Sequence, residues 1–253
     1  MSDDGKRRYA RGVSDYLLQR IPSTMVSGGP MVALDHKTRY LQVAFNYDLG
    51  MVTRILPTIL PSDRILIEAG TPFIKREGAA GIRAIRSMWE GQLVADLKTV
   101  DGALGEVRMA RAAGATAATV LGNSPTEALD LFIARCAEFG MHSMIDMLGV
   151  DDPLRVLMRL KTPPDVVVLH LGRDEEATRG KMIKYRHVKR VRSKSDVLIS
   201  AAGGVDLKEA RSAIFNGANI VVANLVRPGD PWRGISTETD VAQMARQFLA
   251  TIE

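Results

Sequence analysis

Residues 217–225 read GANIVVANL, and residues 114–122 read GATAATVLG. Each stretch begins with a glycine that follows an alanine-rich, helix-like segment, and each then continues into a β-prone run. A glycine can end a helix in the left-handed region of the backbone map. Apolar runs such as IVVA are typical of strands in parallel sheets that are covered on both faces. The recurrence predicts a fold made of repeated strand–helix units.

The same alternation continues along the chain from residue 40 onward, with a helix-length segment after each predicted strand. The predicted strands are 40–45, 65–69, 93–97, 117–121, 142–145, 165–169, 196–200 and 219–223. Eight such units are what a (β/α)8 TIM barrel requires. A doubly wound open sheet usually stops at five or six strands, and no GxGxxG follows the first strand. We therefore expect an α/β protein with one barrel over residues 40–253.

Residues 1–39 do not follow this pattern and are expected to form an N-terminal extension. The simpler interpretation is a surface segment that covers the bottom of the barrel. The alternative is a contact between subunits. No candidate catalytic residue is evident in this segment.

Composition is that of an ordinary globular protein, with 46% hydrophobic and 25% charged residues among 253. The net charge of +5 favours an anionic partner. Basic residues are spread along the chain and aromatic residues are few, so an anionic metabolite is favoured over nucleic acid. Cys136 is the single cysteine, which excludes an internal disulfide. Neither a signal peptide nor an apolar run near the roughly 20 residues of a membrane span is evident, so we expect no membrane association and a cytoplasmic protein.

Polar residues collect where the predicted strands end, which is where barrels carry their functional groups. A charged side chain in a barrel mouth is costly unless it is paired or binds something. Asp146 alone is better explained as a satisfied polar group, but seven polar strand ends together indicate a site. The candidates at these ends are Asn46, Glu68, Thr71, Asp96, Lys98, His170, Gly203, Gly204, Asn224 and Arg227.

Asp96 and Lys98 are two residues apart on one strand, so their side chains should lie on the same face. Asp101 follows in the loop or in the first helical turn. An acid–lysine–acid array would keep the lysine charged and fixed, as stabilisation of a developing oxyanion requires.

Glu68 and Asp96 end adjacent strands. Two carboxylates at that separation can share a divalent cation, and oxygen ligands favour Mg²⁺. The alternative is that one carboxylate simply pairs with Lys98. Gly203 and Gly204 follow the seventh strand, where barrels commonly bind phosphate and where glycines let backbone N–H groups approach an anion.

The chain resembles the orotidine 5′-monophosphate decarboxylase superfamily. Within it, the chain is most similar to the branch of 3-hexulose-6-phosphate synthase and 3-keto-L-gulonate-6-phosphate decarboxylase. The segments IEAGTPFIKREG and ADLKTVDG are specific to this branch. The matching segments fall in order at 41–49, 67–78, 94–107, 113–122, 167–177 and 201–210.

This resemblance implies a function for each matching position. Glu68 and Asp96 match ligands of Mg²⁺, with Mn²⁺ as an alternative, and Lys98 matches a lysine that stabilises an enediolate. Asp101 matches an aspartate that reaches into the neighbouring subunit's site, which implies a homodimer with shared active sites. His170 matches a proton-transfer residue, and the glycines at 203–204 match the phosphate-binding loop.

Three positions depart from the family pattern. Asn46 stands where an aspartate usually ends the first strand, although Asp48 could replace it if the strand end were shifted. Asn224, after Ala223, stands where a Gly-Gly or Gly-Arg pair usually binds phosphate, and Arg227 is the candidate for the missing charge. Arg173 is more typical of the decarboxylase branch. These changes leave the exact substrate open.

The resemblance therefore implies aldol addition of formaldehyde to ribulose 5-phosphate, or its reverse, through a magnesium-bound enediolate. The second hypothesis is a decarboxylase or aldolase that acts on another phosphorylated sugar. The third is a barrel that has lost catalysis and has a binding or regulatory role. The joint presence of the acidic residues, Lys98 and His170 argues against the third, because an unused buried charge cluster is costly.

Overall fold

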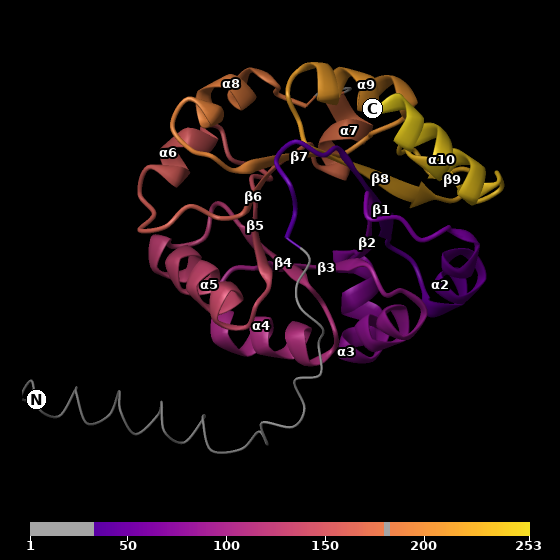
Figure 1. Cartoon of the computed structure of the whole chain (residues 1–253), viewed down its shortest axis with the longest axis horizontal. Helices are drawn as coiled ribbons and strands as arrows, with labels where there is room; N and C mark the ends of the chain where they lie inside the picture. Colours follow the sequence, from indigo (N-terminus) through magenta and orange to yellow (C-terminus); the bar gives the residue numbers. More distant parts are fainter. Residues whose placement is uncertain (1–32, 180–182) are drawn as a thin grey trace, which may run out of the picture. The chain divides into compact units, whose positions relative to one another are not determined.

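Eight parallel strands form a closed barrel in the computed structural model, which describes residues 33–179 and 183–253 (Figure 1). Each strand pairs with the next along the chain, and the last of the eight pairs with the first. The strands are β1 (Tyr40–Phe45), β2 (Ile65–Ala69), β3 (Gln92–Thr99), β4 (Ala117–Leu121), β5 (His142–Asp146), β6 (Val166–His170), β7 (Leu198–Ala202) and β8 (Ile220–Val226), with a short β9 (Ile235–Ser236) beside β8. The predicted (β/α)8 barrel is confirmed.

Helices surround the strands and connect them (Figure 1). Their bounds are α2 (Leu49–Ile55), η2 (Leu56–Thr58), α3 (Thr71–Met88), α4 (Ala103–Ala112), α5 (Thr126–Glu138), α6 (Pro153–Leu157), α7 (Arg173–Arg179), α8 (Arg186–Arg192), α9 (Leu207–Phe215) and α10 (Val241–Thr251). None of the described helices is long and apolar enough to cross a membrane.

Two separate apolar layers follow from the alternation of side chains along each strand. In β1, Tyr40 and Ala44 point into the barrel and join the inner layer. Leu41, Val43 and Phe45 point outward and pack in the larger layer beneath the helices. Because both faces of each strand are buried, the strands read as nearly continuous apolar runs.

The two glycines of the opening motif end helices as predicted. Gly114 follows α4 with a φ of 97°, and Gly217 follows α9 with a φ of 96°. In both cases the next alanine donates its N–H to a carbonyl five residues earlier, at 3.0 Å. This closure satisfies carbonyls that the helix end would otherwise leave unpaired.

The seventh strand begins two residues later than the predicted 196–200. The Asp196 side chain is exposed beside His36, so the buried ladder starts only at Leu198. The predicted extension, residues 1–39, lies outside the described residues except for 33–39. Its boundary therefore stays a prediction.

Candidate functional site

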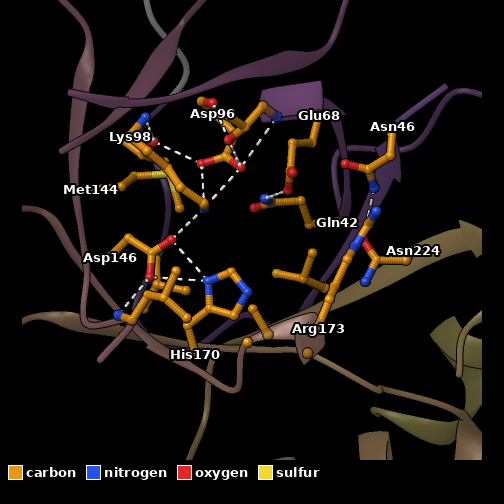
Figure 2. Close-up of a pocket in the computed structure, with 18 of the residues that line it drawn as sticks. Gln42, Asn46, Glu68, Asp96, Lys98, Met144, Asp146, His170, Arg173 and Asn224 are labelled. Atoms are coloured by element: carbon orange, nitrogen blue, oxygen red, sulfur yellow. Dashed lines mark hydrogen bonds and ion pairs between the residues drawn. The ribbon is translucent and has the colours of Figure 1, made fainter. Parts of the chain in front are cut away.

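A cavity of about 220 Å³ opens at the carboxyl ends of the strands, and all eight barrel strands contribute to its wall (Figure 2). Its polar and charged lining residues are Gln42, Asn46, Glu68, Thr71, Asp96, Lys98, Thr119, Asp146, His170, Arg173 and Asn224. Gly172 and Gly203 also line it. Most of the residues predicted from the strand ends are thus brought into one cavity.

Strand alternation explains why these side chains point inward. Ala44 of β1 lies in the inner apolar layer. Asn46 follows two residues later, just after the end of the strand, so its side chain lies on the same face. Leu66 precedes Glu68 in the same way, and Val94 precedes Asp96. In each case the apolar residues fill the barrel below, and the last inward position of the strand is polar.

Asp96 and Lys98 form the predicted pair. Lys98 Nζ lies 3.0 Å from both carboxylate oxygens of Asp96. Thr119 Oγ1 donates to Asp96 Oδ1 at 2.8 Å, and it accepts the backbone N–H of Lys98 at 2.9 Å. Thr71 Oγ1 lies 2.7 Å from Asp96 Oδ2 on the other side. Asp96 is therefore held by three neighbouring side chains.

The backbone at Lys98 is unusual. Its φ of 49° makes it the one non-glycine residue in the described part of the chain with a left-handed φ. The pairing of β3 with β4 shifts register between Ala95 and Thr99, which marks a bulge. A left-handed residue other than glycine costs roughly 1–2 kcal/mol, and such strain is common at functional sites. The bulge turns Lys98 toward strand β5 rather than leaving it in simple alternation.

Asp146, at the end of β5, is the second acid that holds Lys98. Its Oδ2 accepts Lys98 Nζ at 2.6 Å and lies 2.8 Å from His170 Nδ1. Leu148 N donates to its Oδ1 at 3.0 Å. Burial alone would raise the pKa of Asp146, but the neighbouring His170 and Lys98 outweigh it and hold this pKa well below its usual range.

The same contacts act on Lys98. Burial would lower the pKa of this ammonium, but Asp96 and Asp146 raise it above its usual value. Both carboxylates therefore favour the charged form of the lysine. Its second acid is Asp146 and not Asp101, because Asp146 Oδ2 lies 2.6 Å from Lys98 Nζ, whereas Asp101 is exposed in the loop after β3.

Asp101 lies elsewhere. It is exposed in the loop between β3 and α4 and is not part of the cavity wall of its own chain.

Glu68 is a buried carboxylate close to Asp96. Burial, followed by the negative charge of Asp96, raises the pKa of Glu68 to about 7. Gln42 Nε2 donates to Glu68 Oε2, while Gln42 Oε1 is buried without a hydrogen-bond partner. Two carboxylates and a free amide oxygen at one end of the cavity suit a hard divalent cation, which would offset their charge.

No group of three or more His, Cys, Asp or Glu residues is arranged to hold a metal within residues 33–179 and 183–253. A site based on Glu68 and Asp96 would offer an ion two carboxylates from the protein. Mg²⁺ binds in this way, with water and substrate completing its shell.

Asn46 and Asn224 contact each other across the junction of β1 and β8. Asn46 Nδ2 donates to Asn224 Oδ1 at 2.9 Å (Figure 2). A Cβ atom on Gly70 would lie 2.1 Å from Asn46 Oδ1, so only glycine leaves room for this side chain. The two departures from the family pattern thus form one hydrogen-bonded pair. Asp48 does not replace Asn46, because it caps α2 by accepting Met51 N at 2.9 Å.

Gly203 lines the cavity, and Gly204 does not. Both have left-handed φ values, of 95° and 62°. A Cβ atom on Gly204 would lie 2.5 Å from Glu176 Oε1 and 2.9 Å from an Arg233 nitrogen. This loop is therefore packed against an ion pair in addition to facing the cavity.

Arg227 is also outside the cavity wall. Its guanidinium pairs with Asp48 Oδ2 at 2.6 Å and stacks on the Tyr47 ring at 4.3 Å. The expectation that Arg227 supplies a charge to the substrate is not supported by this arrangement. The arginine that does line the cavity is Arg173.

Sequence reasoning missed Gln42, Thr119 and the central position of Asp146. Gln42 could have been found, because it is a polar residue at an inward position of an otherwise apolar strand. Thr119 carried no such signal, since threonine is common in strands.

Known proteins place this chain in a family. Residues 30–224 match the model of the Orotidine 5'-phosphate decarboxylase / HUMPS family. The chain belongs to this family. The resemblance drawn from the motifs is therefore confirmed.

Curated relatives of this chain include proteins named bifunctional enzyme Fae/Hps. That of Methanothrix thermoacetophila is 37% identical over 216 residues, which is 85% of this chain and 53% of that protein. That of Methanosarcina acetivorans is 38% identical, over 83% of this chain and 52% of that protein. The chain thus spans about half the length of these relatives.

Solved structures agree on the fold. The 3-hexulose-6-phosphate synthase from Salmonella typhimurium superposes with a TM-score of 0.73 at 26% identity, covering 84% of this chain and 98% of that one. The 3-keto-L-gulonate-6-phosphate decarboxylase from Vibrio cholerae gives a TM-score of 0.68 at 21% identity, over 85% and 97%. The second likeness shows the fold alone.

Proposed function

We propose that this chain is a 3-hexulose-6-phosphate synthase, which joins formaldehyde to ribulose 5-phosphate by aldol addition or catalyses the reverse reaction. The observation that carries the proposal is the buried cluster of Asp96, Lys98, Asp146 and His170 at one end of the cavity. Similarity to Fae/Hps enzymes and to synthase structures supports it.

The reaction removes a proton from C1 of ribulose 5-phosphate, which leaves an enediolate. C1 of the enediolate then forms a bond to the carbon of formaldehyde, and the C2 oxygen becomes a carbonyl again. The oxygen of formaldehyde takes up a proton and becomes a hydroxyl. Each step creates or consumes negative charge on oxygen, so a fixed cation near that oxygen lowers the barrier.

Lys98 supplies that cation. Asp96 and Asp146 keep its ammonium charged and in place before substrate binds. No reorganisation is then needed as the oxyanion develops, which is the main advantage of a pre-arranged charge.

His170 is suited to proton transfer. Its Nδ1 contacts Asp146, so Nε2 is the ring nitrogen that remains for substrate. A carboxylate at one imidazole nitrogen fixes the tautomer and the orientation of the ring.

Glu68 and Asp96 would hold Mg²⁺, or Mn²⁺, with Gln42 Oε1 as a further neighbour. When bound, the ion would supply Lewis-acid polarisation of two adjacent substrate oxygens.

A homodimer is part of the proposal. Asp101 is exposed outside its own cavity, which is compatible with a role in a neighbouring subunit's site. Mixing Asp101→Ala subunits with Lys98→Ala subunits should regenerate one intact site per heterodimer. Mixtures without any regained activity would argue against the shared site. Cytoplasmic location and the lack of a nucleic-acid partner stay predictions from the sequence.

The test of function is direct. Incubation with ribulose 5-phosphate, formaldehyde and Mg²⁺ should form a hexulose phosphate, detected by mass spectrometry with ¹³C-formaldehyde as the labelled substrate. Failure to form product with either Mg²⁺ or Mn²⁺ would refute the synthase assignment. A parallel incubation with 3-keto-L-gulonate 6-phosphate, followed for CO₂ release, tests the decarboxylase alternative.

A further inference from the structure

Arg173 lines the cavity and is stacked on an aromatic ring from a distant part of the chain. It begins α7, just after β6, and its Cζ lies 4.7 Å from the centroid of the Trp232 ring. Trp232 belongs to the segment between β8 and β9. In Figure 2 the Arg173 side chain extends toward Asn46 and Asn224, away from the Lys98 cluster.

Three arginines, Arg173, Arg227 and Arg233, lie near this side of the barrel mouth, and they differ in their ion pairs. Arg227 is neutralised by Asp48 at 2.6 Å. Arg233 pairs with Glu176 at 3.3 Å and lies 3.8 Å from Asp206. Within the described part of the chain, no carboxylate lies within ion-pair distance of Arg173.

The two ends of the cavity therefore differ in charge. The inner end holds Glu68, Asp96 and Asp146 around one lysine. A phosphate there would meet carboxylates at close range, which is strongly unfavourable in a buried site. The opposite end carries the unpaired Arg173 beside uncharged amide side chains.

We propose that Arg173 is the cation that binds the substrate's phosphate, and that Trp232 is the positioning residue that holds it ready. This inference rests on the proposed function only in taking the substrate to be a phosphorylated sugar. It assigns the phosphate to Arg173, at the start of α7, rather than to Arg227 or Arg233 in the segment after β8.

Trp232 acts on Arg173 through its ring. A mobile arginine side chain would lose conformational freedom about several rotatable bonds when it binds an anion. A stacked arginine has already lost part of that freedom, so binding costs it less entropy. Stacking also leaves the N–H groups at the guanidinium edge available for an anion while the planar face rests on the indole.

Calorimetric titration of the purified protein with ribulose 5-phosphate and with unphosphorylated ribulose tests the assignment. Arg173→Gln should weaken ribulose 5-phosphate binding by roughly 10- to 100-fold, the value of a charge-assisted hydrogen bond. It should change ribulose binding by less than about threefold, since ribulose carries no phosphate. Arg76→Gln, an exposed arginine of α3, is the matched control.

Trp232 variants separate positioning from general stability. Trp232→Ala should raise the Kd and KM for ribulose 5-phosphate by roughly 3- to 10-fold with kcat little changed, and Trp232→Phe should restore most of the loss. Equal weakening of both ligands by Arg173→Gln would overturn the phosphate assignment. A larger loss with Arg233→Gln would place the phosphate at Gly204 instead.

A second measurement keeps this inference distinct from the synthase proposal. In a Trp89→Phe background Trp232 is the single tryptophan, so inorganic phosphate should change its fluorescence in an Arg173-dependent way. An Arg173-dependent change in fluorescence in a protein without synthase activity would refute the proposed reaction and leave the phosphate site standing. Synthase activity with an unchanged KM in Arg173→Gln would refute only the phosphate site. Calorimetry with phosphate decides the same point if Trp89→Phe fails to fold.

Discussion

Replacing Asp146 by asparagine tests the charge cluster most directly. The change keeps the volume of the side chain, so it leaves no cavity and isolates the loss of charge. In the native protein two strong donors, Lys98 Nζ and His170 Nδ1, meet this carboxylate. An amide has a single acceptor oxygen, so one donor would keep a weaker hydrogen bond and the other would face an N–H group.

The expected cost follows from these two changes. Weakening a charge-assisted hydrogen bond to a neutral one costs about 1 kcal/mol, and leaving a buried donor unpaired costs roughly 1.5–3 kcal/mol. Asp146→Asn should therefore destabilise the protein by about 3 kcal/mol at pH 7. At roughly 2–4 °C per kcal/mol for a chain of this size, Tm should fall by about 6–12 °C.

The pH dependence of this loss has a definite sign. The pKa of Asp146 is lower in the folded protein than in the unfolded chain. Its contribution to stability is complete above the unfolded value of about 4 and is lost as the pH falls toward the folded value. The difference between wild type and Asp146→Asn should stay constant from about pH 5 to 8 and shrink below about pH 4.

Urea unfolding followed by circular dichroism at several pH values measures this difference. Asp63→Asn, at an exposed position, is the matched control and is expected to change stability by less than about 0.5 kcal/mol. If Asp146→Asn were as stable as that control at pH 7, the cluster would contribute no net stability. A difference that grew on acidification would mean that the sign of the pKa shift is wrong.

Three further predictions concern the site. Lys98→Ala should lower turnover by roughly 10²–10³ with an unchanged circular dichroism spectrum, whereas exposed Lys75→Ala should leave turnover near wild type; near-normal turnover in the first variant would make Lys98 structural. Gly70→Ala should cost roughly 1–3 kcal/mol and raise KM, because its Cβ would displace the Asn46 side chain; Gly105→Ala meets nothing within 4 Å and should be neutral or stabilising. EDTA should abolish activity, and Mg²⁺ or Mn²⁺ should restore it; activity that survives exhaustive chelation would exclude the metal.

Much of the fold was predictable because local patterns and tertiary structure agree. Apolar strands and glycine helix ends indicated the barrel, and polar residues at seven strand ends indicated the site. The positions of Glu68, Asp96 and His170 followed from strand alternation alone. Their meeting in one cavity followed from the rule that parallel strands end at the same edge.

The details that sequence patterns missed depend on geometry between strands. The partner of Lys98 is decided by a bulge and a left-handed φ, and neither has a signature in ADLKTVD. Whether an arginine reaches the cavity depends on which carboxylate is closer to it, as Arg227 and Asp48 show. Such choices involve residues far apart in the chain.

The Asn46–Asn224 hydrogen bond joins residues 178 positions apart, across the seam where the last barrel strand meets the first. During synthesis at roughly 5–20 residues per second, the first strand waits on the order of 10–35 s for its partner. A nascent chain that lacks β8 has no complete cavity and no means of holding substrate. Ligand affinity therefore reports that β8 has been made and has paired with β1, and a bound ligand would stabilise only chains that have reached this point.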